Sequence, residues 1–532
     1  MTSAVRIQGT SSFDVCVIGS GFGGGVAALR SAEAGASVVV LEQGRRWDKH
    51  ADASVFRQTQ ADLGYFADLF DIKAGFDVAG NTASLVLGGR GLGGGSLVYS
   101  MVSLRAPSLV FDDPIWPVEV TRAELDPHYL RAERQLGVTQ LQWTGDRPAD
   151  DWKLTSKRDA VFAQACANAG VSCDPTPVAI NNDCGNLGWC TTGCIRHGKN
   201  SVDLRYHNPA EALGAEVRIN AHVRGIAPAG VGAGRRWRIT YLVGNGQVSD
   251  LLQQGTAVDV FADRVIIAGG AVGSPTVLQL SAGALPGGVS SQCGLNLSRG
   301  GDLLIPVVLP DSFAIDDVDM LPGKIIGSCS FEYMFNPPPG FGADWQRFVM
   351  QPMNILPVLS AVIVADPHGI TGDVGDMRTF GEGQKHLMSK WGTRLLHLGI
   401  MGMDGMDGMV SVNGGIPTVS FGMSATTRKL FAGARAAAKH IFEDSNGGQV
   451  LPSWDQLRGD ALAIHPLGTC RMASGPDLGV VDHQCRVFKA DGGVHEGLYV
   501  MDASTFSSPI GVNTSLTAAA VAERAMAIMF AG

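Results

Sequence analysis

The sequence has no uninterrupted apolar run approaching the ~20 residues that a membrane-spanning helix needs. It also has no run of Lys and Arg, and its net charge of −9 argues against a nucleic-acid-binding surface. Ten cysteines in 532 residues are too few for a disulfide framework of the small secreted kind. The first residues show no basic stretch followed by an apolar secretory run. We therefore expect a cytoplasmic protein, and leave contact with a membrane surface open.

Glycine, by contrast, is abundant, with 70 residues, and hydrophobic residues make up 45% of the chain. The glycines bunch in three places, at Gly19–Gly25, Gly88–Gly95 and Gly269–Gly273. Such bunching indicates backbone packed closely against a ligand. A chain of this length exceeds one ordinary core, so we expect two closely joined domains or one large composite unit.

The first glycine cluster lies in a strand–turn–helix pattern. The apolar run Phe13–Ile18 predicts a buried parallel strand, and the six residues after it satisfy G-x-G-x-x-G. An Ala-rich helix is expected over 26–34 and a second strand over 37–41. Gly19 permits the tight turn, Gly21 lets the backbone approach a pyrophosphate, and Gly24 lets helix and strand pack closely.

An acidic residue completes this pattern. Glu42 ends the second strand 18 residues after Gly24, near the ~20 expected of an acid that binds a ribose diol. The start of a helix also offers free N–H groups and a partial positive charge to phosphates. The pattern predicts a bound dinucleotide without deciding between FAD and NAD.

Further motifs lie far from this turn. They are the glycine-rich run 88–99, the segment His465–Cys470, and the segment 498–504 with the Gly511-Val512-Asn513 and the helix over 514–529 that follow it. With the first motif and the blocks at 116–117, 125–129 and 265–275, they resemble the glucose–methanol–choline (GMC) oxidoreductases, and most closely their bacterial cholesterol-oxidase-like branch. The blocks span most of the chain, whereas residues 311–459 match loosely.

The resemblance implies an α/β fold. A Rossmann-like FAD-binding domain would be interleaved with a substrate domain built on a large antiparallel sheet covered by helices. The FAD-binding domain would take residues 1–310, with insertions at about 111–195. The substrate domain would take 311–459, and residues 460–532 would return to the FAD-binding domain with the catalytic residues.

The resemblance also implies FAD as the cofactor. No histidine lies in the loop 88–101, where some relatives attach FAD covalently, so we expect non-covalent binding. The cofactor contacts implied by position are Gly91, Gly93, Gly94 and Ser96 at the flavin side, Val223 in a strand-like segment 217–223 at the adenine, Asp502 and Ala503 at the pyrophosphate or flavin, and Asn513 at the flavin ring.

Two residues resemble the family's catalytic pair. Oxidation of an alcohol by a flavin needs one group to take the hydroxyl proton and another to hold the oxygen. His465 resembles the base, and imidazole has the side-chain pKa suited to this task near neutrality. Asn513 resembles its partner, an amide able to donate to the substrate oxygen, although an Asn before a helix is also a common N-cap. The resemblance implies hydride transfer from a CH–OH carbon to flavin N5.

The expected substrate is an apolar, cyclic or sterol-like alcohol, because the segment Phe348–Ala365 is mostly apolar. Cholesterol oxidases of the non-covalent type carry a glutamate in this sheet that isomerises the steroid double bond. This segment contains Gln351 and Asn354 but no acid, and Glu332 is a displaced candidate. Steroid isomerisation is therefore in doubt, whereas alcohol oxidation is not.

Three questions stay open at the level of sequence. The electron acceptor is oxygen, a quinone or a protein. One alternative is a flavin-containing lyase of the same family without net redox, and another is an NAD-dependent Rossmann dehydrogenase. Cys184, Cys190 and Cys194 are close in sequence, but metal and cluster sites usually need four ligands, often in C-x-x-C pairs. We expect a packed loop over the cofactor and no metal.

Overall fold

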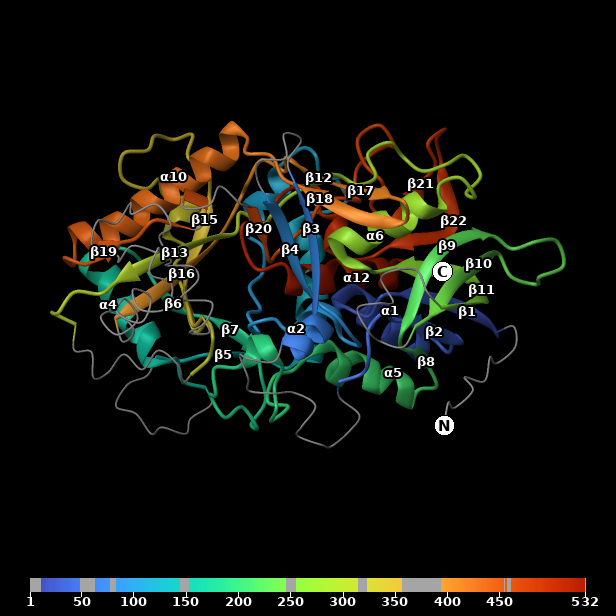
Figure 1. The fold of residues 1–532 in the computed structure, drawn as a ribbon, viewed down its shortest axis with the longest axis horizontal. Coiled ribbons are helices and arrows are strands. Elements are labelled where there is room, and N and C mark those ends of the chain that lie inside the picture. Colours follow the sequence, from blue (N-terminus) through green and yellow to red (C-terminus); the bar gives the residue numbers. More distant parts are fainter. Residues whose placement is uncertain are drawn as a thin grey trace.

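The computed structural model describes residues 11–47, 63–76, 83–143, 153–244, 255–313, 323–355, 394–453, 455–456 and 461–531. Two sheets lie towards opposite ends of the molecule, and a third, smaller one stands between them (Figure 1). This arrangement is the mixed α/β fold that the resemblance implies.

The first sheet contains eight of the described strands and is mainly parallel at its centre. Its main path is β21 (Arg486–Phe488), β22 (Val494–Val500), β11 (Thr256–Ile267), β1 (Ser11–Ile18), β2 (Val38–Leu41) and β8 (Glu216–Arg218). An antiparallel extension adds β10 (Trp237–Val243) and β9 (Ala221–Pro228) beside β11. The chain thus leaves this sheet and returns to it near its C-terminal end.

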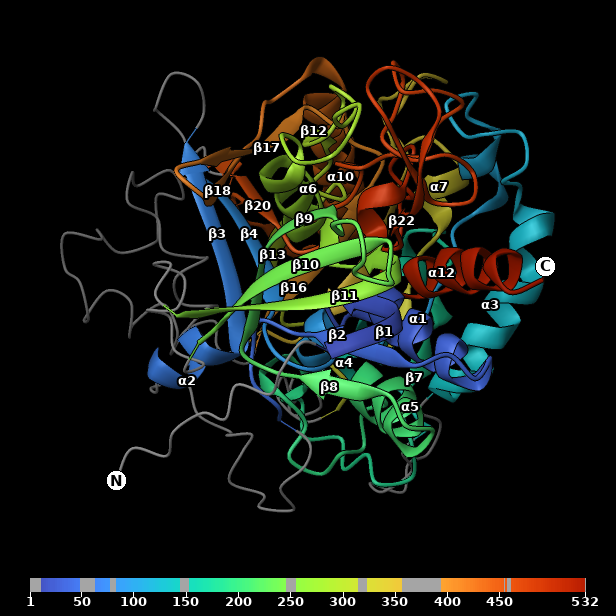
Figure 2. The ribbon, with the colours of Figure 1, turned by 90° about the vertical axis from the view of Figure 1, so that its right-hand side faces the viewer.

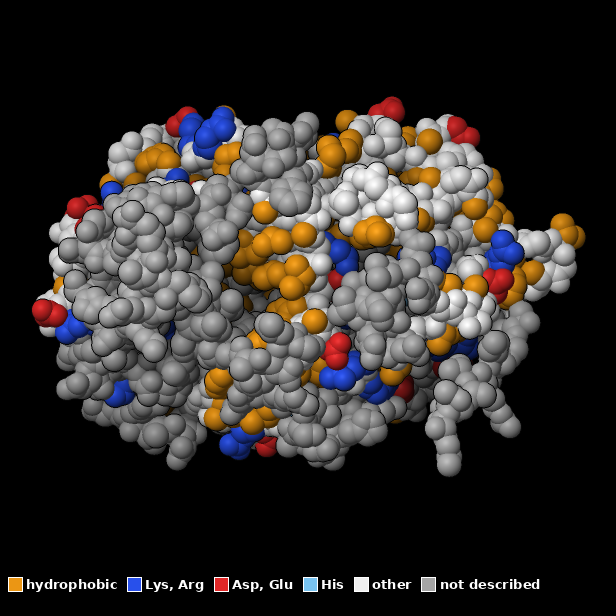
Figure 3. Space-filling model, viewed as in Figure 1, with side chains coloured by type: hydrophobic (Ala, Val, Ile, Leu, Met, Phe, Trp, Pro, Cys, Tyr) orange, Lys and Arg blue, Asp and Glu red, His pale blue; other side chains and the backbone are white. Residues whose placement is uncertain are grey.

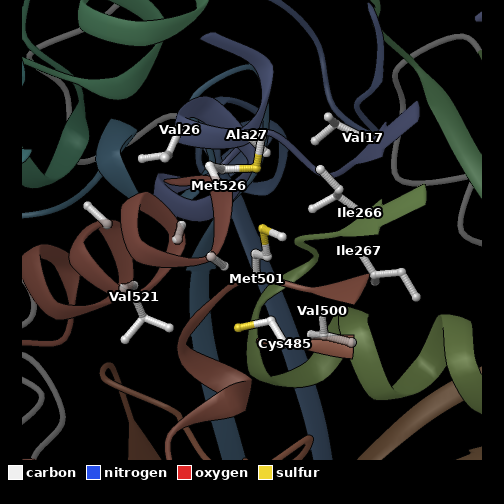
Figure 4. Close-up of a cluster of buried hydrophobic side chains, with 14 of the residues drawn as sticks. Val17, Val26, Ala27, Ile266, Ile267, Cys485, Val500, Met501, Val521 and Met526 are labelled. Atoms are coloured by element: carbon white, nitrogen blue, oxygen red, sulfur yellow. The ribbon is translucent and has the colours of Figure 1, made fainter. Parts of the chain in front are cut away.

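The helix α1 (Phe22–Glu33) packs on this sheet, and α12 (Ser515–Met529) packs against α1. In Figure 4, Met501 and Met526 lie within the apolar cluster formed by the strands and these helices. The buried Arg30 of α1 makes a two-point ion pair with Glu523 of α12, at 2.7 and 2.8 Å. Figure 2 shows α12 beside α3 (Arg122–Leu136), which packs on its other side.

The second sheet is antiparallel. Its described strands are β15 (Phe348–Met353), β16 (Leu395–Gly402), β13 (Leu303–Val308) and β19 (Gln449–Val450). One face packs against α10 (Ala425–Lys439) through side chains such as Phe348 and Leu398. Because side chains alternate along a strand, Val349, Gln351 and Met401 lie on the other face, and Val349 and Met401 belong to the same core cluster as the first sheet.

The third sheet joins β3 (Phe70–Phe76), β4 (Ala83–Gly89) and β20 (Ala461–Ala463). One of its faces is buried against β17 (Gly408–Asn413) and β18 (Ile416–Ser420). The register places apolar side chains together on the opposite face: Ile72, Ala74, Leu85, Leu87 and Leu462. We call this the apolar face. Figure 3 shows hydrophobic side chains gathered over these strands, and Ile72 is 54% exposed.

The structure differs from the sequence expectation in three places. The segment 217–223 is not one strand, because Asn220 adopts φ 53° and separates β8 from β9. The strand β13 lies in the second sheet although it precedes residue 311, so the strands of that sheet come from both sides of the expected boundary. The expected helix over 26–34 begins earlier, at Phe22, and the expected helix over 514–529 is α12.

Candidate active site

The first glycine cluster holds the start of α1 close to its neighbours. Gly19 has φ +91°, and a Cβ there would lie 2.5 Å from the carbonyl oxygen of Ala268. A Cβ on Gly24 would lie 2.1 Å from the carbonyl oxygen of Gly19, so helix and turn approach closely. A Cβ on Gly23 would lie 1.6 Å from the carbonyl oxygen of Met501. These positions admit glycine alone without a backbone shift.

Gly21 is different, because a Cβ there would meet nothing within 4 Å. Gly21 is the N-cap of α1 and gives it no side-chain cap, so the helix start presents backbone donors to an open space. The second glycine cluster borders the same place: a Cβ on Gly94 would lie 2.9 Å from the Cα of Gly21, and one on Gly95 would meet nothing. Two glycine clusters far apart in sequence therefore meet at one opening.

Glu42 lies at the end of β2, buried beside this turn. Its carboxylate accepts hydrogen bonds from Ser20 Oγ at 2.5 Å and from Gly44 N at 2.7 Å. Ser20 Oγ in turn accepts from Gly93 N at 3.0 Å, which ties the acid to the second glycine cluster. Burial raises the pKa of Glu42 above its usual value, despite these hydrogen bonds.

The remaining expected cofactor contacts surround the same region. Val223 lies on β9, whose first residue, Ala221, donates its N–H to the Glu42 carbonyl at 2.8 Å. Ser96 is already engaged, since its Oγ donates to Gly93 O at 2.7 Å and accepts from Val202 N at 2.9 Å. Gly91 stands against Trp47, with φ +129°. These contacts are compatible with the expected roles of Val223, Ser96 and Gly91 in binding the cofactor, and those roles stay predictions.

The carboxylate of Asp502 organises the third glycine cluster. It accepts from Gly270 N and Ser504 N, both at 2.8 Å, and from the hydroxyl of Ser274. Burial raises the pKa of Asp502 above its usual value. Its neighbour Ala503 accepts from Gly468 N at 3.2 Å, which links this segment to the one that carries His465.

His465 is held by a carboxylate that the sequence did not single out. Its Nδ1 lies 2.7 Å from Oδ1 of Asp302, and Oδ2 of Asp302 accepts the backbone N–H of residues 464 and 465 at 2.6 and 2.8 Å. The His465 side chain keeps 20% of its surface exposed. Burial lowers the pKa of His465, but the charge and hydrogen bond of Asp302 outweigh it and leave that pKa above its ordinary value.

The ring orientation follows from these contacts. A carboxylate only accepts, so Nδ1 of His465 carries the proton and donates it to Asp302. The Nε2 atom then carries a lone pair. Asn513 Nδ2 lies 3.2 Å from Nε2, and an amide nitrogen only donates, so both contacts require the same tautomer.

Asn513 in turn contacts the second sheet. Gln351 Nε2 lies 3.1 Å from Asn513 Oδ1 and donates to it. The N-cap of α12 is Thr514, without a side-chain hydrogen bond, so the amide of Asn513 serves this contact rather than the helix. Hydrogen bonds join four side chains in a row, which we call the polar line: Asp302, His465, Asn513 and Gln351.

The structure thus brings the expected pair together and adds two residues. No motif connects Asp302 with a histidine 163 residues away; the one signal is the Gly300–Gly301 pair before it. Gly300 packs on His465, where a Cβ would lie 2.7 Å from the His465 Cβ. The carboxylate of Glu332 has other partners: it accepts from Ser172 Oγ and from Asn336. Residues 356–365 of the apolar segment lie outside the described residues.

The cysteine segment packs beside the second glycine cluster. Cys184, Cys190 and Cys194 are free, and burial raises the pKa of Cys190 to about 12. Lys199 Nζ donates to the carbonyls of Cys190 at 2.8 Å and Leu97 at 2.6 Å. Within the described ranges, no group of three or more His, Cys, Asp or Glu is placed to hold a metal ion. Nor does any helix there combine the length and apolarity needed to cross a bilayer.

Comparison with known proteins identifies the family. One family model, described as GMC oxidoreductase, matches residues 14–298, and a second of the same description matches residues 415–522. The chain belongs to the GMC oxidoreductase family. This GMC protein is accordingly an enzyme, a flavoprotein oxidoreductase.

Its relatives agree with this assignment. The cholesterol oxidase of Acinetobacter baumannii is 26% identical over 97% of this chain and 94% of its own. The cholesterol oxidase of Mycobacterium tuberculosis is 27% identical over 97% and 91%. Among solved structures, pyridoxine 4-oxidase from Mesorbium loti matches with a TM-score of 0.66 at 17% identity, covering 98% of this chain and 99% of that one, which shows the shared fold.

Proposed function

We propose that this GMC oxidoreductase oxidises the CH–OH group of an apolar alcohol to a carbonyl with non-covalently bound FAD. The observation that carries the proposal is the Nε2 atom of His465. Its lone pair lies 3.2 Å from the donor amide of Asn513, while Asp302 holds the opposite ring nitrogen. A base and an oxygen-binding donor side by side are what removal of hydride from a carbinol carbon requires.

The residues around Gly21 fit FAD. The open space at Gly21 and Gly95 gives room for the pyrophosphate. The start of α1, which has no side-chain cap, offers backbone N–H donors to the phosphates, and the buried Glu42 offers an acceptor to a ribose diol. The loop 88–101 holds no histidine, which favours non-covalent attachment. When bound, FAD supplies the acceptor of the hydride.

The chain's own residues then move the proton. His465 Nε2 accepts the hydroxyl proton of the alcohol as the C–H bond breaks and its electron pair leaves as hydride. The imidazolium that results is stabilised by the carboxylate of Asp302 at 2.7 Å. Asn513 Nδ2 donates to the oxygen as negative charge develops on it, so proton acceptor and oxygen donor act on the same atom.

Apolar surroundings favour an apolar substrate. Val349 and Met401 flank Gln351 on the second sheet, and the apolar face ends next to Ile464, which precedes His465 and is 48% exposed. The two bacterial relatives carry the name cholesterol oxidase. A cyclic or sterol-like alcohol fits these observations. Gln351, an amide, occupies the place beside Asn513, which favours oxidation without a shift of a double bond.

The spectrum of the purified protein tests the proposal. We expect a yellow protein whose flavin absorbance is bleached anaerobically by apolar alcohols, with one carbonyl formed per flavin reduced. Flavin that is not bleached while substrate is cleaved would indicate a lyase instead. A colourless protein that cannot be reconstituted with FAD but uses NAD would overturn the proposal. Peroxide formed on admission of air would identify oxygen as an electron acceptor.

A further inference from the structure

Gln351 is the member of the polar line that neither catalysis nor packing explains by itself. It lies on β15 with 0% of its surface exposed, opposite Gly399 of β16. Its Nε2 donates to Asn513 Oδ1 at 3.1 Å. Its Oε1 is buried and has no hydrogen-bond partner among the described residues. The side chain also lies beside the buried Cys329, where it partly offsets the rise that burial gives the pKa of that thiol.

An unpaired buried carbonyl costs stability, so the Gln351 amide stabilises the fold less than an apolar side chain of the same size would. A methionine of similar length would fill the same volume without that cost, and Met353 and Met401 already stand nearby on this face. What Gln351 offers and methionine does not is one N–H aimed at Asn513.

That N–H selects between two orientations of Asn513. Rotating the amide of Asn513 by half a turn exchanges its Oδ1 and Nδ2 and would place an acceptor against Nε2 of His465. A donor on Oδ1 permits just one of these orientations. A carboxylate in place of Gln351 would select the other, because it accepts and never donates.

We propose that Gln351 is a positioning residue that holds the amide of Asn513 with its Nδ2 towards Nε2 of His465, and thereby favours the neutral, proton-accepting form of that histidine. The proposal rests on the proposed function only in naming His465 as the base.

The two ends of the polar line have opposite effects on the protonation of His465. Asp302 favours the protonated ring and raises the pKa of His465. A hydrogen bond donated to the Nε2 lone pair exists only while the ring is neutral, so the Asn513 amide, held by Gln351, favours the neutral ring. Among the described residues, Asp302 is the one charged group whose charge acts on His465. Asp302 therefore makes His465 a stronger base, and the amide of Asn513 favours its unprotonated form.

Titration of His465 in the FAD-bound, oxidised protein tests this without any alcohol. The probe is the imidazole ¹³Cε1 resonance, identified by its loss in His465→Gln. We expect Gln351→Met to raise the pKa of His465 by about half a pH unit or more, with the fold at least as stable as before. Gln351→Leu gives the same comparison with a second side chain, should the methionine variant fail to fold.

The double variant shows whether Gln351 acts through Asn513. Asn513→Ala should raise the pKa of His465 as well, and adding Gln351→Met to it should change nothing further. Met350→Leu, on the same strand but facing α10, is the matched control and should titrate as the native protein does.

A Gln351→Met variant whose His465 titrates within about 0.2 pH units of the native value would overturn the proposal. So would a double variant in which the pKa shift of His465 equals the sum of the shifts in the two single variants. Anaerobic reduction of the flavin adds a kinetic readout. Gln351→Met should lower the limiting rate about tenfold, while the alcohol concentration that gives half of that rate changes little. The titration needs no turnover, so failure of the positioning role and failure of the proposed function appear in different measurements.

Discussion

Asp302 binds His465 at two points, with Oδ1 2.7 Å from Nδ1 of the ring and Oδ2 accepting the backbone N–H of the same residue at 2.8 Å. The first contact fixes which nitrogen carries the proton. The second fixes the backbone from which the ring projects. Together they leave Nε2 unprotonated and facing Asn513, which is the arrangement that a proton acceptor needs.

Replacing Asp302 by Asn should move the pH dependence of flavin reduction. Since the base works only when neutral, the native rate should fall as pH falls through the pKa of His465, which Asp302 holds above its ordinary value of 6.5. Without the carboxylate this pKa drops, so the acid limb should move to lower pH. The limiting rate should fall about 10- to 100-fold, because the base is weaker and its ring less well oriented.

The measurement is the anaerobic reduction rate of the FAD-bound variant between pH 5 and 9, a range chosen to bracket histidine titration at about 6.5. Asp344→Asn, at an exposed ion pair with Lys429, is the control and should leave the profile unchanged. An Asp302→Asn profile with its acid limb at the native pH would remove the carboxylate from its role.

Gly21→Ala should separate cofactor binding from folding. The new methyl group meets no protein atom within 4 Å and the residue has φ −69°, so the apoprotein should melt within about 2 °C of the native one. The methyl group instead enters the space assigned to the pyrophosphate, and the Kd for FAD should rise about tenfold or more.

Fluorescence titration of the apoprotein with FAD measures this effect. Gly283→Ala adds an equally unopposed methyl group away from the site and should leave the Kd unchanged. Gly23→Ala, whose Cβ would lie 1.6 Å from Met501 O, should destabilise the protein itself. Native FAD affinity in Gly21→Ala would show that the cofactor does not occupy this opening.

Glu523→Ala should destabilise the FAD-binding sheet and its helices. The change leaves Arg30, which is 8% exposed, without its two-point partner in the interface between α1 and α12. Breaking a buried pair by removing one partner costs about 3–5 kcal/mol of unfolding free energy, and the lower end of this range is expected here because Glu33 still pairs with Arg30. Urea denaturation measures the loss. Glu33→Ala removes a partner of Arg30 that is 40% exposed and should cost about 1 kcal/mol or less. Equal losses in the two variants would contradict this account.

The sequence predicted those features that local patterns or a family resemblance determine. Phe13–Ile18, the glycine turn and the following helix are adjacent in the chain, so the local sequence pattern indicates β1 and α1. His465 and Asn513 were expected together, and the structure places their side chains 3.2 Å apart.

Other features depend on the tertiary fold. The contact between Gln351 and Asn513 depends on which face of β15 turns inward, and the segment 348–365 matched the family too loosely to reveal it. The partnership of Asp302 with His465 depends on the close approach of Gly300 to the histidine backbone. The break at Asn220 follows from one residue's backbone conformation, which the apolar pattern of 217–223 conceals.

The rate of anaerobic flavin reduction in His465→Ala tests the central claim most directly. The variant loses the proton acceptor but none of the residues around Gly21, so FAD should remain bound and the protein yellow. With an alcohol that bleaches the native protein, we expect reduction slower by about 10²-fold or more. Reduction at close to the native rate, with FAD bound, would show that His465 is not the base.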